Sequence, residues 1–444
     1  MRKTTFYFFL LTLFSAFNLL GQNTGPDQKI QRDLSRYFEL PREAIFLHLN
    51  KTTYTQDENI WFKGYIYDRK AGQPFVATTN VYVGIYDSIG KQISKKLYLS
   101  KNGYFQGNIV IDSTFTTGNH YIKARTNWMR NFEEDDSFVQ KIEIVDNSSF
   151  AKNTILPKYD VQFLPEGGNI IADILNTIGV KALNQNGYGE EIHKAQILDK
   201  NNNPIASFTT NKYGLGKFNF TPKSNENYRA KVIFKNGQES LFPLPLAKKE
   251  GIALQLKNNT LQEKIALVIN TNKYTRDKIK KEKFYLAVHS DGISNLFDFN
   301  FSENNSVSFL LDKKDLKKGV NTITVFDEAG VPLTERLFFN SYDFNIPEIQ
   351  VAKKVAAKDS VSLSLKIPEN TSVQNNLSIS VLPKGSISYN PQHNILSTFH
   401  LKPYVKGFIE NPGQYFTDFS TQKEYDLDLL LLTQGWSRYE WKNM

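Results

Sequence analysis

Short alternations of apolar and polar residues recur along most of the chain from residue 43 onward. In Val81–Tyr86, two valines and an isoleucine alternate with two tyrosines and a glycine, which is the two-residue period of a half-buried β-strand. The same alternation occurs in Ile60–Tyr67, Tyr121–Thr126 and Phe138–Val145, and turn-forming sequences separate these segments. The spacing predicts a β-sandwich over 43–147.

The same rhythm continues beyond this first unit. It predicts a second β-sandwich over 158–247 and a third over 252–345, which ends in a hairpin of Thr322–Phe326 and Pro332–Phe339. A fourth sandwich, complete or incomplete, is expected within 346–444, with Ser360–Lys366 and Leu377–Leu382 as alternating strands. The pattern therefore predicts an all-β chain of tandem immunoglobulin-like sandwiches in a row.

Two segments have a helical pattern instead. In the N-terminal segment 22–42, a short helix is expected around Asp27–Tyr37, ending before Pro41. Near the other end, Leu427 and Leu429–Leu432 followed by Trp436 and Tyr439 predict one C-terminal amphipathic helix over 424–440.

Composition and the N-terminus indicate export. The 444 residues include no cysteine, which excludes disulfides, thiol catalysis and a cysteine thioester. Arg2 and Lys3 precede the apolar stretch Phe6–Leu20, as in a signal peptide over 1–21 cleaved after Gly21; an N-terminal membrane anchor is the alternative. No later segment reaches 18 consecutive apolar residues, so no transmembrane segment is expected after cleavage.

Charge gives a second indication about partners. Losing Arg2 and Lys3 with the signal peptide lowers the net charge from +9 to +7, which is still basic. Because export is expected, nucleic acid is not an expected partner, and anionic envelope surfaces or glycans are favoured. The most basic stretch, Lys273–Lys283, is expected to be a solvated strand edge.

No template for catalysis, cofactor binding or metal binding is recognised, so the chain is expected not to be an enzyme. Gly214–Lys217 superficially resembles a phosphate loop but is better explained as a β-turn between alternating segments. The acidic run Glu133–Asp136 lacks the spacing of a calcium loop and is expected to be a solvated hairpin tip. The histidines lack a second ligand at metal spacing; they are His48, His120, His193, His289, His393 and His400.

Several motifs resemble one family. The run from Ala44 to Lys63, with Tyr54, Glu58 and the pair Ile60/Phe62, resembles a macroglobulin domain of the second type, except that Gln56-Asp57 stands where Pro-Gly is usual. Further segments resemble signatures of the large exported macroglobulin-like proteins of Bacteroidetes, in the alpha-2-macroglobulin superfamily; they are Tyr121–Phe132, Val161–Gly168, Gly407–Phe416 and Leu427–Trp441. The resemblance implies that 43–147 is a macroglobulin-type-2-like sandwich and that the other sandwiches are macroglobulin-like.

The same resemblance leads to expectations about whether the chain is part of a longer protein and about individual binding or modification sites. Longer relatives continue past the Trp441 element into a carboxypeptidase-regulatory-like sandwich and a TonB-receptor plug-like domain, so this chain is either a short member or part of a longer one. Trp128 and Arg130 form a recognition site or, as the simpler interpretation, an aromatic plug and a salt bridge that close a sandwich. Three segments resemble O-glycosylation acceptors of exported Bacteroidetes proteins: 87–89, 112–114 and 359–361.

These observations lead to one principal hypothesis and two alternatives. The principal one is a non-enzymatic protein of the periplasm or outer-membrane periphery of a Gram-negative bacterium, acting as a β-sandwich scaffold or interaction arm in outer-membrane transport or assembly. Its partner would be an envelope protein such as an outer-membrane β-barrel or a TonB-dependent transporter. The first alternative is a thioester-less macroglobulin-like protease inhibitor with a bait stretch at Glu369–Asn376. The second is a glycan or surface adhesion module.

Overall fold

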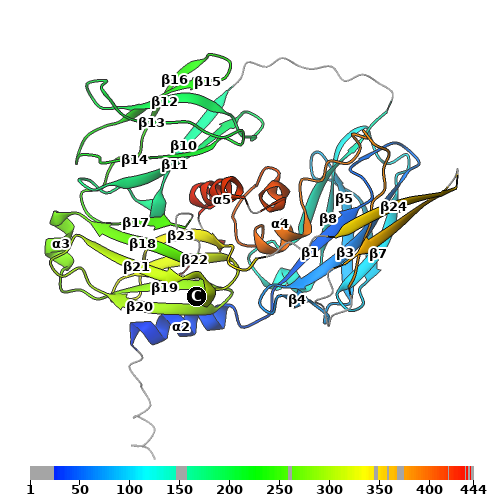
Figure 1. Ribbon diagram of the computed structural model, residues 1–444, viewed down its shortest axis with the longest axis horizontal. Helices are drawn as coiled ribbons and strands as arrows, with labels where there is room; N and C mark the ends of the chain where they lie inside the picture. The colour runs from blue at the N-terminus through cyan, green and yellow to red at the C-terminus, as the bar shows by residue number, and fades with distance from the viewer. Residues whose placement is uncertain are drawn as a thin grey trace, which may run out of the picture.

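Three β-sandwiches pack around a short C-terminal helical segment (Figure 1). This computed structural model describes the following residues: 25–146, 158–258, 263–344, 349–357, 360–367, 375–418, 420–435, 437–438 and 441. The expected signal peptide, residues 1–21, lies outside the described residues.

The N-terminal helix α2, Pro26–Tyr37, forms where the sequence predicts one. Pro26 is at the start of the helix, where its missing N–H costs no hydrogen bond, and Asp27 lies in the first turn. Ile30, Leu34 and Phe38 share one face because they are four residues apart. That face is buried against the third sandwich, on Tyr285, Ala287 and Phe326, so the helix belongs to a domain that begins more than 200 residues later in the chain.

The first sandwich occupies the range predicted for it. Val81, Val83 and Ile85 are completely buried between its sheets, while Tyr82 and Tyr86 are half-buried, as their alternation predicts. One sheet has the order β1–β3–β4, with β7 also paired to β3, and the other has the order β2–β9–β8–β5–β6. The elements are β1 Glu43–Leu49, β2 Thr53–Tyr54, β3 Asn59–Asp68, β4 Gln73–Pro74, β5 Asn80–Asp87, β6 Gln92–Leu99, β7 Tyr104–Val110, β8 Gly118–Arg125, the 3-10 turn η2 Trp128–Asn131 and β9 Phe138–Ile144.

The second sandwich pairs a three-stranded sheet, β10–β11–β14, with a four-stranded one, β13–β12–β15–β16. Gly214 ends the tight turn Asn211–Gly214 with φ of 69°, and a Cβ there would lie 2.0 Å from the carbonyl oxygen of Ala182. A β-turn therefore forms here, as expected, but it ends at Gly214, and Leu215–Lys217 already belong to strand β14. The elements are β10 Tyr159–Pro165, η3 Glu166–Gly168, β11 Asn176–Asn184, β12 Ile192–Leu198, β13 Pro204–Phe208, β14 Leu215–Phe220, β15 Arg229–Phe234 and β16 Glu239–Pro243.

The third sandwich pairs sheets of the orders β17–β18–β21 and β20–β19–β22–β23. Its last two strands form the hairpin predicted from the sequence. The expectation for Lys273–Lys283 is wrong: Lys273–Ile279 form helix α3, because the Asn272 side chain caps its start by accepting from the Thr275 N–H. The elements are β17 Ile252–Lys257, β18 Lys264–Thr271, β19 Phe284–Ser290, β20 Ile293–Phe299, β21 Ser306–Asp312, η4 Lys313–Asp315, β22 Gly319–Phe326 and β23 Pro332–Asn340.

A fourth sandwich is not formed by the described part of 346–444. Ser360–Lys366 is a strand, as predicted, but it pairs only with β24 in a two-stranded sheet. The strand predicted at Leu377–Leu382 does not form: no described strand pairs with this segment, and its serines bond to the first sandwich instead. The elements are β24 Gln350–Ala357, β25 Ser360–Lys366, α4 Ile395–His400, η5 Pro412–Phe416 and α5 Thr421–Thr433.

Helix α5 differs from the predicted amphipathic helix in both extent and environment. It begins at Thr421 and ends at Thr433, and every residue from Leu427 to Thr433 is buried. The reason is its position at the centre of the molecule, between the second and third sandwiches and beside α4 (Figure 1). From Leu427 onward the helix is covered on all sides and has no solvent-facing stripe, whereas Thr421, Gln422 and Tyr425 in its first half are exposed.

Candidate functional site

A buried charge network joins the first sandwich to the third. The third sandwich therefore contacts the first directly as well as following the second in the chain. The Arg69 guanidinium, just after β3, donates to Asp136 Oδ2 at 2.8 Å and to Asp291 Oδ1 at 2.9 Å. All three side chains are 4% exposed or less. Two carboxylates from different parts of the fold thus neutralise one buried arginine, as a charge out of water requires.

Asp291 is the point in this network where the most groups meet. It occupies the turn between β19 and β20 with φ of 47°, and its Oδ2 accepts from Lys317 Nζ at 2.8 Å and from the Tyr404 hydroxyl at 2.6 Å. Burial alone would raise the pKa of Asp291, but the charges of Arg69 and Lys317 outweigh it and hold that pKa well below its usual range. The carboxylate is therefore ionised.

The C-terminal residues complete the network. Arg438 Nη1 donates to Asp136 Oδ1 at 2.5 Å, and the Tyr404 ring lies 4.7 Å from the Arg69 guanidinium. Lys402 Nζ donates to the Ser137 carbonyl at 2.9 Å; burial and the nearby Arg438 charge lower the pKa of Lys402 to about 8. We refer to Arg69, Asp136, Asp291, Lys317, Tyr404 and Arg438 as the junction network.

The acidic run Glu133–Asp136 is therefore not the solvated hairpin tip expected from the sequence. Asp136 belongs to the junction network, and Glu134 is buried 3.6 Å from Arg42. Arg42 also lies among the rings of Tyr37, Phe38 and Phe132. Glu133 and Asp135 are exposed, as expected of a solvated tip, and Asp135 pairs with Lys123 at 2.8 Å.

A second buried network joins the second and third sandwiches to α5. Arg336 of β23 donates through Nε to Glu166 Oε1 at 2.9 Å and through Nη2 to Asp428 Oδ1 at 2.7 Å. Its side chain is 2% exposed. Burial opposes the charge of Arg336, but Asp428 and Glu166 outweigh it and raise the pKa of Arg336. We refer to Glu166, Arg336 and Asp428 as the Arg336 network.

The glycine after Glu166 allows this close approach. Gly167 has φ of 78°, and its carbonyl accepts from Thr334 Oγ1 at 2.7 Å. A Cβ at this position would lie 2.0 Å from the same Oγ1. The segment Val161–Gly168, singled out in the sequence, therefore serves as a docking element between sandwiches.

The simpler interpretation of Trp128 and Arg130 was an aromatic plug and a salt bridge that close the first sandwich. Trp128 fits the role of the plug, but Arg130 does not form the salt bridge. Trp128 Nε1 donates to the Pro41 carbonyl at 2.8 Å, and its indole packs edge-on against Phe132. Arg130 is exposed, and no ion pair is recorded for it among the described residues. The two side chains are thus not brought together as one recognition site.

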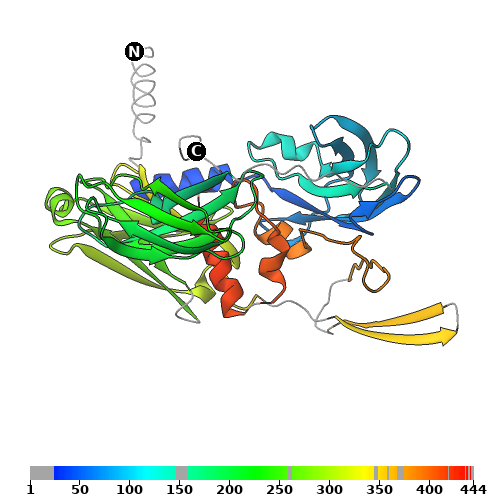
Figure 2. The same cartoon turned by 90° about the horizontal axis from the view of Figure 1, so that it is seen from above.

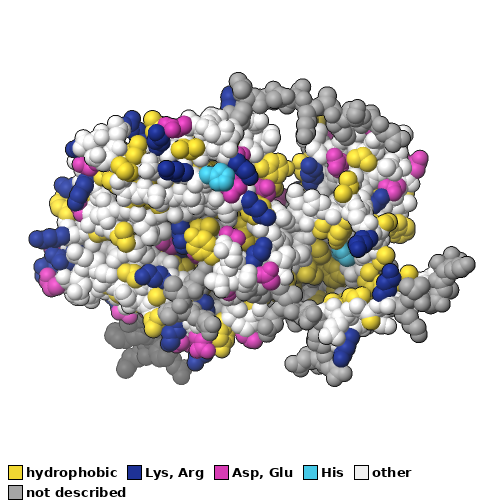
Figure 3. Space-filling view, turned by 45° about the horizontal axis from the view of Figure 1, so that its top comes forward, with side chains coloured by type: hydrophobic (Ala, Val, Ile, Leu, Met, Phe, Trp, Pro, Cys, Tyr) yellow, Lys and Arg dark blue, Asp and Glu magenta, His cyan; other side chains and the backbone are white. Residues whose placement is uncertain are grey.

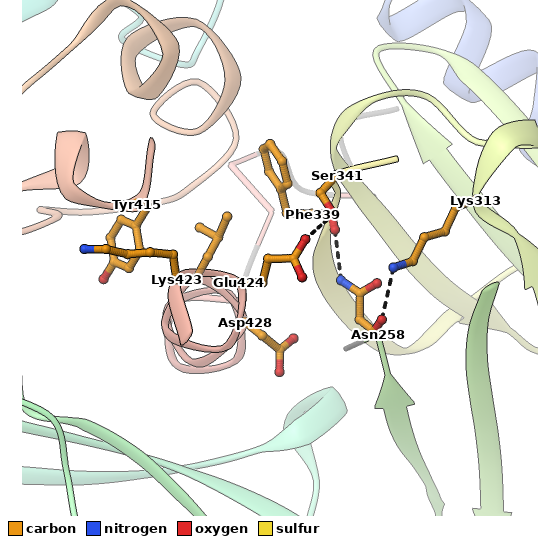
Figure 4. A pocket seen from close by; sticks show the side chains of 9 residues that line it. Asn258, Lys313, Phe339, Ser341, Tyr415, Lys423, Glu424 and Asp428 are labelled. Atoms are coloured by element: carbon orange, nitrogen blue, oxygen red, sulfur yellow. Dashed lines mark hydrogen bonds between the residues drawn. The ribbon is translucent and has the colours of Figure 1, made fainter. Parts of the chain in front are cut away.

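The cavities indicate no small-molecule site of obvious chemistry. Figure 4 shows one beside α5, where Glu424 bonds to Ser341 at 2.5 Å and Lys313 to the Asn258 carbonyl at 3.1 Å. Its volume is about 10 Å³, room for one water. Two larger hollows of about 720 and 740 Å³ are open grooves between the second sandwich and α5, one along the first half of the helix and one at its C-terminal end.

The described residues contain no group of three or more histidine, aspartate or glutamate side chains placed to hold a metal ion. No helix among them is long and apolar enough to cross a membrane. Of the candidate glycosylation acceptors, Ser88 and Ser113 lie on exposed turns, whereas Asp359 lies outside the described residues. Residues 369–374 of the candidate bait stretch also lie outside them.

Residues 376–390, which we call the strap, lie over the outer face of the first sandwich. The Ser378 hydroxyl contacts His48 Nδ1 at 2.6 Å and the Tyr65 hydroxyl at 2.7 Å. The Ser388 carbonyl accepts from the backbone N–H groups of Thr52 and Thr53. The sequence predicted a strand at Leu377–Leu382 but not its contacts with the first sandwich, because serines make these contacts and their polarity favours solvent or a loop.

Comparison with known proteins gives a limited result. No family model and no curated protein matches the chain. Among solved structures, Escherichia coli alpha-2-macroglobulin activated by porcine elastase is similar at 11% identity and a TM-score of 0.25, over 73% of this chain and 33% of that one. Dimeric latent PorU from Porphyromonas gingivalis is similar at 12% identity and a TM-score of 0.27, over 74% and 34%.

The E. coli adhesin FdeC is similar at 11% identity and a TM-score of 0.18, over 67% of this chain and 96% of the adhesin. The chain spans only about a quarter to a third of the bacterial alpha-2-macroglobulins that it resembles. At these TM-scores the likenesses carry no information about domain arrangement or activity. The all-β sandwich fold is established by the strands and sheets themselves.

Proposed function

We propose that this protein is a non-enzymatic scaffold of the bacterial envelope, an arm of fixed geometry that presents an interaction surface to a protein partner in outer-membrane transport or assembly. The observation that carries the proposal is the bridge from Arg69 to both Asp136 and Asp291, which locks the first sandwich to the third. The expected signal peptide and the motifs resembling exported macroglobulin-like proteins support the envelope as the compartment.

Fixed geometry follows from the cost of disturbing the two networks. Removing one partner of a buried ion pair leaves an uncompensated charge and typically costs about 3–5 kcal/mol. Both networks join residues from separate sandwiches, and both also include a residue from the C-terminal segment, Arg438 or Asp428. Hinge motion between the sandwiches would have to expose these charges.

The β24–β25 hairpin supports the interaction role. It projects away from the body, well clear of the three sandwiches (Figure 2). The face shown in Figure 3 has fewer features of an interaction surface. Lys and Arg side chains are spread over it, with hydrophobic side chains in small groups between them. Exposed aromatic residues that could stack on sugars are also dispersed, with Trp61 on β3, Tyr274 on α3 and Tyr425 on α5.

The test is affinity purification of the tagged full-length protein from its native envelope in mild detergent, followed by quantitative mass spectrometry. The proposal predicts near-stoichiometric recovery of an outer-membrane β-barrel or transporter, and reduced recovery with Asp291→Asn, which loosens the junction. Asp298→Ala, which removes an exposed pair with Lys283 on the same hairpin, is the matched control. Recovery of the protein alone, or with a protease attached, would refute the proposal.

A further inference from the structure

The β24–β25 hairpin has one apolar face, and this face is uncovered. The register pairs Val351 with Leu365, which places them on the same side as Val361 and Leu363. Val351 is 60% exposed, Val361 55% and Leu363 40%. The opposite face of β25 carries Ser362 and Ser364. Strand pairs in one sheet of a sandwich show this pattern, with an apolar face that packs on the second sheet. In this hairpin the apolar face is exposed to solvent instead.

The strap repeats this arrangement. Its serines at 378 and 380 face the first sandwich, where Ser378 contacts His48 and Tyr65 and Ser380 bonds to the Asn50 carbonyl. The alternate residues therefore point outward: Leu377 is 37% exposed, Ile379 58% and Val381 75%. A segment with the alternation of a β-strand is held in place by its polar side and leaves its apolar side free.

Both segments also have backbone that no described strand pairs with, although the Leu377 carbonyl accepts from Lys63 Nζ at 2.9 Å. Each strand of the hairpin has one outer edge, and no described strand pairs with either edge or with Leu377–Leu382. A two-stranded hairpin is marginally stable on its own in water, and an apolar edge strand invites pairing with another chain. The surface thus offers backbone hydrogen bonds and alternating apolar side chains together, as in recognition by strand addition.

The charge of this region indicates the chemistry of what covers it. Residues 350–366 contain four lysines and one aspartate, and residues 375–384 contain one lysine and no carboxylate. Lys353 stands on the apolar face of the hairpin itself, opposite Leu363. A covering strand must supply carboxylates near these lysines as well as apolar side chains.

We propose that the hairpin and Leu377–Leu382 form a docking surface completed by strands of a partner protein in which apolar residues alternate with Asp or Glu. The proposal rests on the proposed scaffold function and names the surface through which it acts. A second copy of the chain fits less well, because stacking two such hairpins places lysines against lysines. An anionic lipid surface complements the charge but leaves the strand edges unpaired in hydrocarbon.

Site-specific photocrosslinking in the native envelope tests the proposal directly. A photoreactive residue in place of Leu363 samples the apolar face, and the same residue in place of Ser364 samples the opposite face as the matched control. The expected product from position 363, identified by mass spectrometry, is a peptide in which apolar and acidic residues alternate, with at least tenfold less from position 364. Crosslinks to lipid, to a second copy of this chain, equally from both faces, or to nothing would overturn it.

A paired substitution provides a second readout that does not depend on crosslinking. Val361→Lys with Leu363→Lys places two charges on the apolar face, and Ser362→Lys with Ser364→Lys places the same charges on the other face. The first pair should reduce recovery of the partner at least tenfold, while the second leaves it within about twofold, with both variants melting as wild type does. If the partner is recovered normally with the first pair, this docking surface is wrong while the scaffold function stands.

Discussion

Arg69 and Asp291 lie 222 positions apart in the sequence, and their side chains are joined by a 2.9 Å hydrogen bond in the interior. Arg69 follows β3 of the first sandwich, and Asp291 forms the β19–β20 turn of the third. Each is nearly inaccessible to water. The pair therefore ties two domains whose strands pair only within their own sheets.

Asp291→Asn is expected to destabilise the protein by about 3 kcal/mol, because it leaves Arg69 and Lys317 with less compensating charge in a buried site. Asparagine is the suitable replacement, since it tolerates the left-handed backbone at this position. Chemical denaturation measures the loss. The exposed-pair variant Asp298→Ala should unfold close to wild type, and an equal loss in the two variants would argue against the junction network.

Arg336→Met is expected to cost about 3–5 kcal/mol, because Glu166 and Asp428 would remain buried without their counter-charge. Neutralising both carboxylates in the same background, with Glu166→Gln and Asp428→Asn, should recover part of the loss. Chemical denaturation of the single and triple variants measures how much of the lost free energy of unfolding is recovered. If the triple variant is less stable than Arg336→Met, the three side chains do not form one network.

The sandwich strands could be predicted from the sequence because the evidence for them is local. Val81, Val83 and Ile85 alternate with their neighbours, and this alternation alone determines which side is buried. The same reasoning misplaced Asp136, because the arginines that allow its burial, Arg69 and Arg438, are far away in the sequence. Local pattern cannot show such partners, so a run of carboxylates looks solvated.

The last quarter of the chain shows a different limit. Leu377–Leu382 has the alternation of a strand, but the predicted strand does not form. The side on which the apolar residues lie was not predictable from the sequence. Ser378 and Ser380 bond to the first sandwich, so Leu377 and Ile379 point outward. In α5, the complete burial of Leu427–Thr433 follows from two flanking sandwiches, which the helix sequence does not record.

Acid is expected to weaken the fold in the window between pH 6.5 and about 4. Burial lowers the pKa of His289 to about 4, so in this window the unfolded state binds a proton that the folded state does not. The stabilisation is complete above the unfolded pKa and is lost as the pH falls, by about 1.4 kcal/mol per pH unit for one histidine.

Denaturation at a series of pH values measures this slope. His289→Gln should reduce it, while His193→Gln, which replaces an exposed histidine, should leave it unchanged. His393 and His400, whose pKa values burial lowers to about 3 and about 4, act in the same direction. A slope that is identical in wild type and His289→Gln would show that His289 is not buried in its neutral form.

Ser378→Ala is expected to loosen the strap without unfolding the body, because it removes the contacts to His48 and Tyr65, each worth about 1 kcal/mol. Hydrogen–deuterium exchange should become faster in residues 376–382 and remain unchanged in β19. Ile387→Ala, at a position of the same segment that is 93% exposed, is the control. Equal exchange in the two variants would mean that Ser378 does not anchor the strap.

The central claim is that the first and third sandwiches form one rigid body, and a distance measurement tests it most directly. Because the chain has no cysteine, spin labels can be placed by Lys95→Cys on β6 and Ser308→Cys on β21, both exposed. Pulsed electron spin resonance should give one narrow distance distribution, which broadens when Asp291→Asn is added. A broad distribution in the otherwise unaltered protein would contradict the account, because the sandwiches would then move as separate beads.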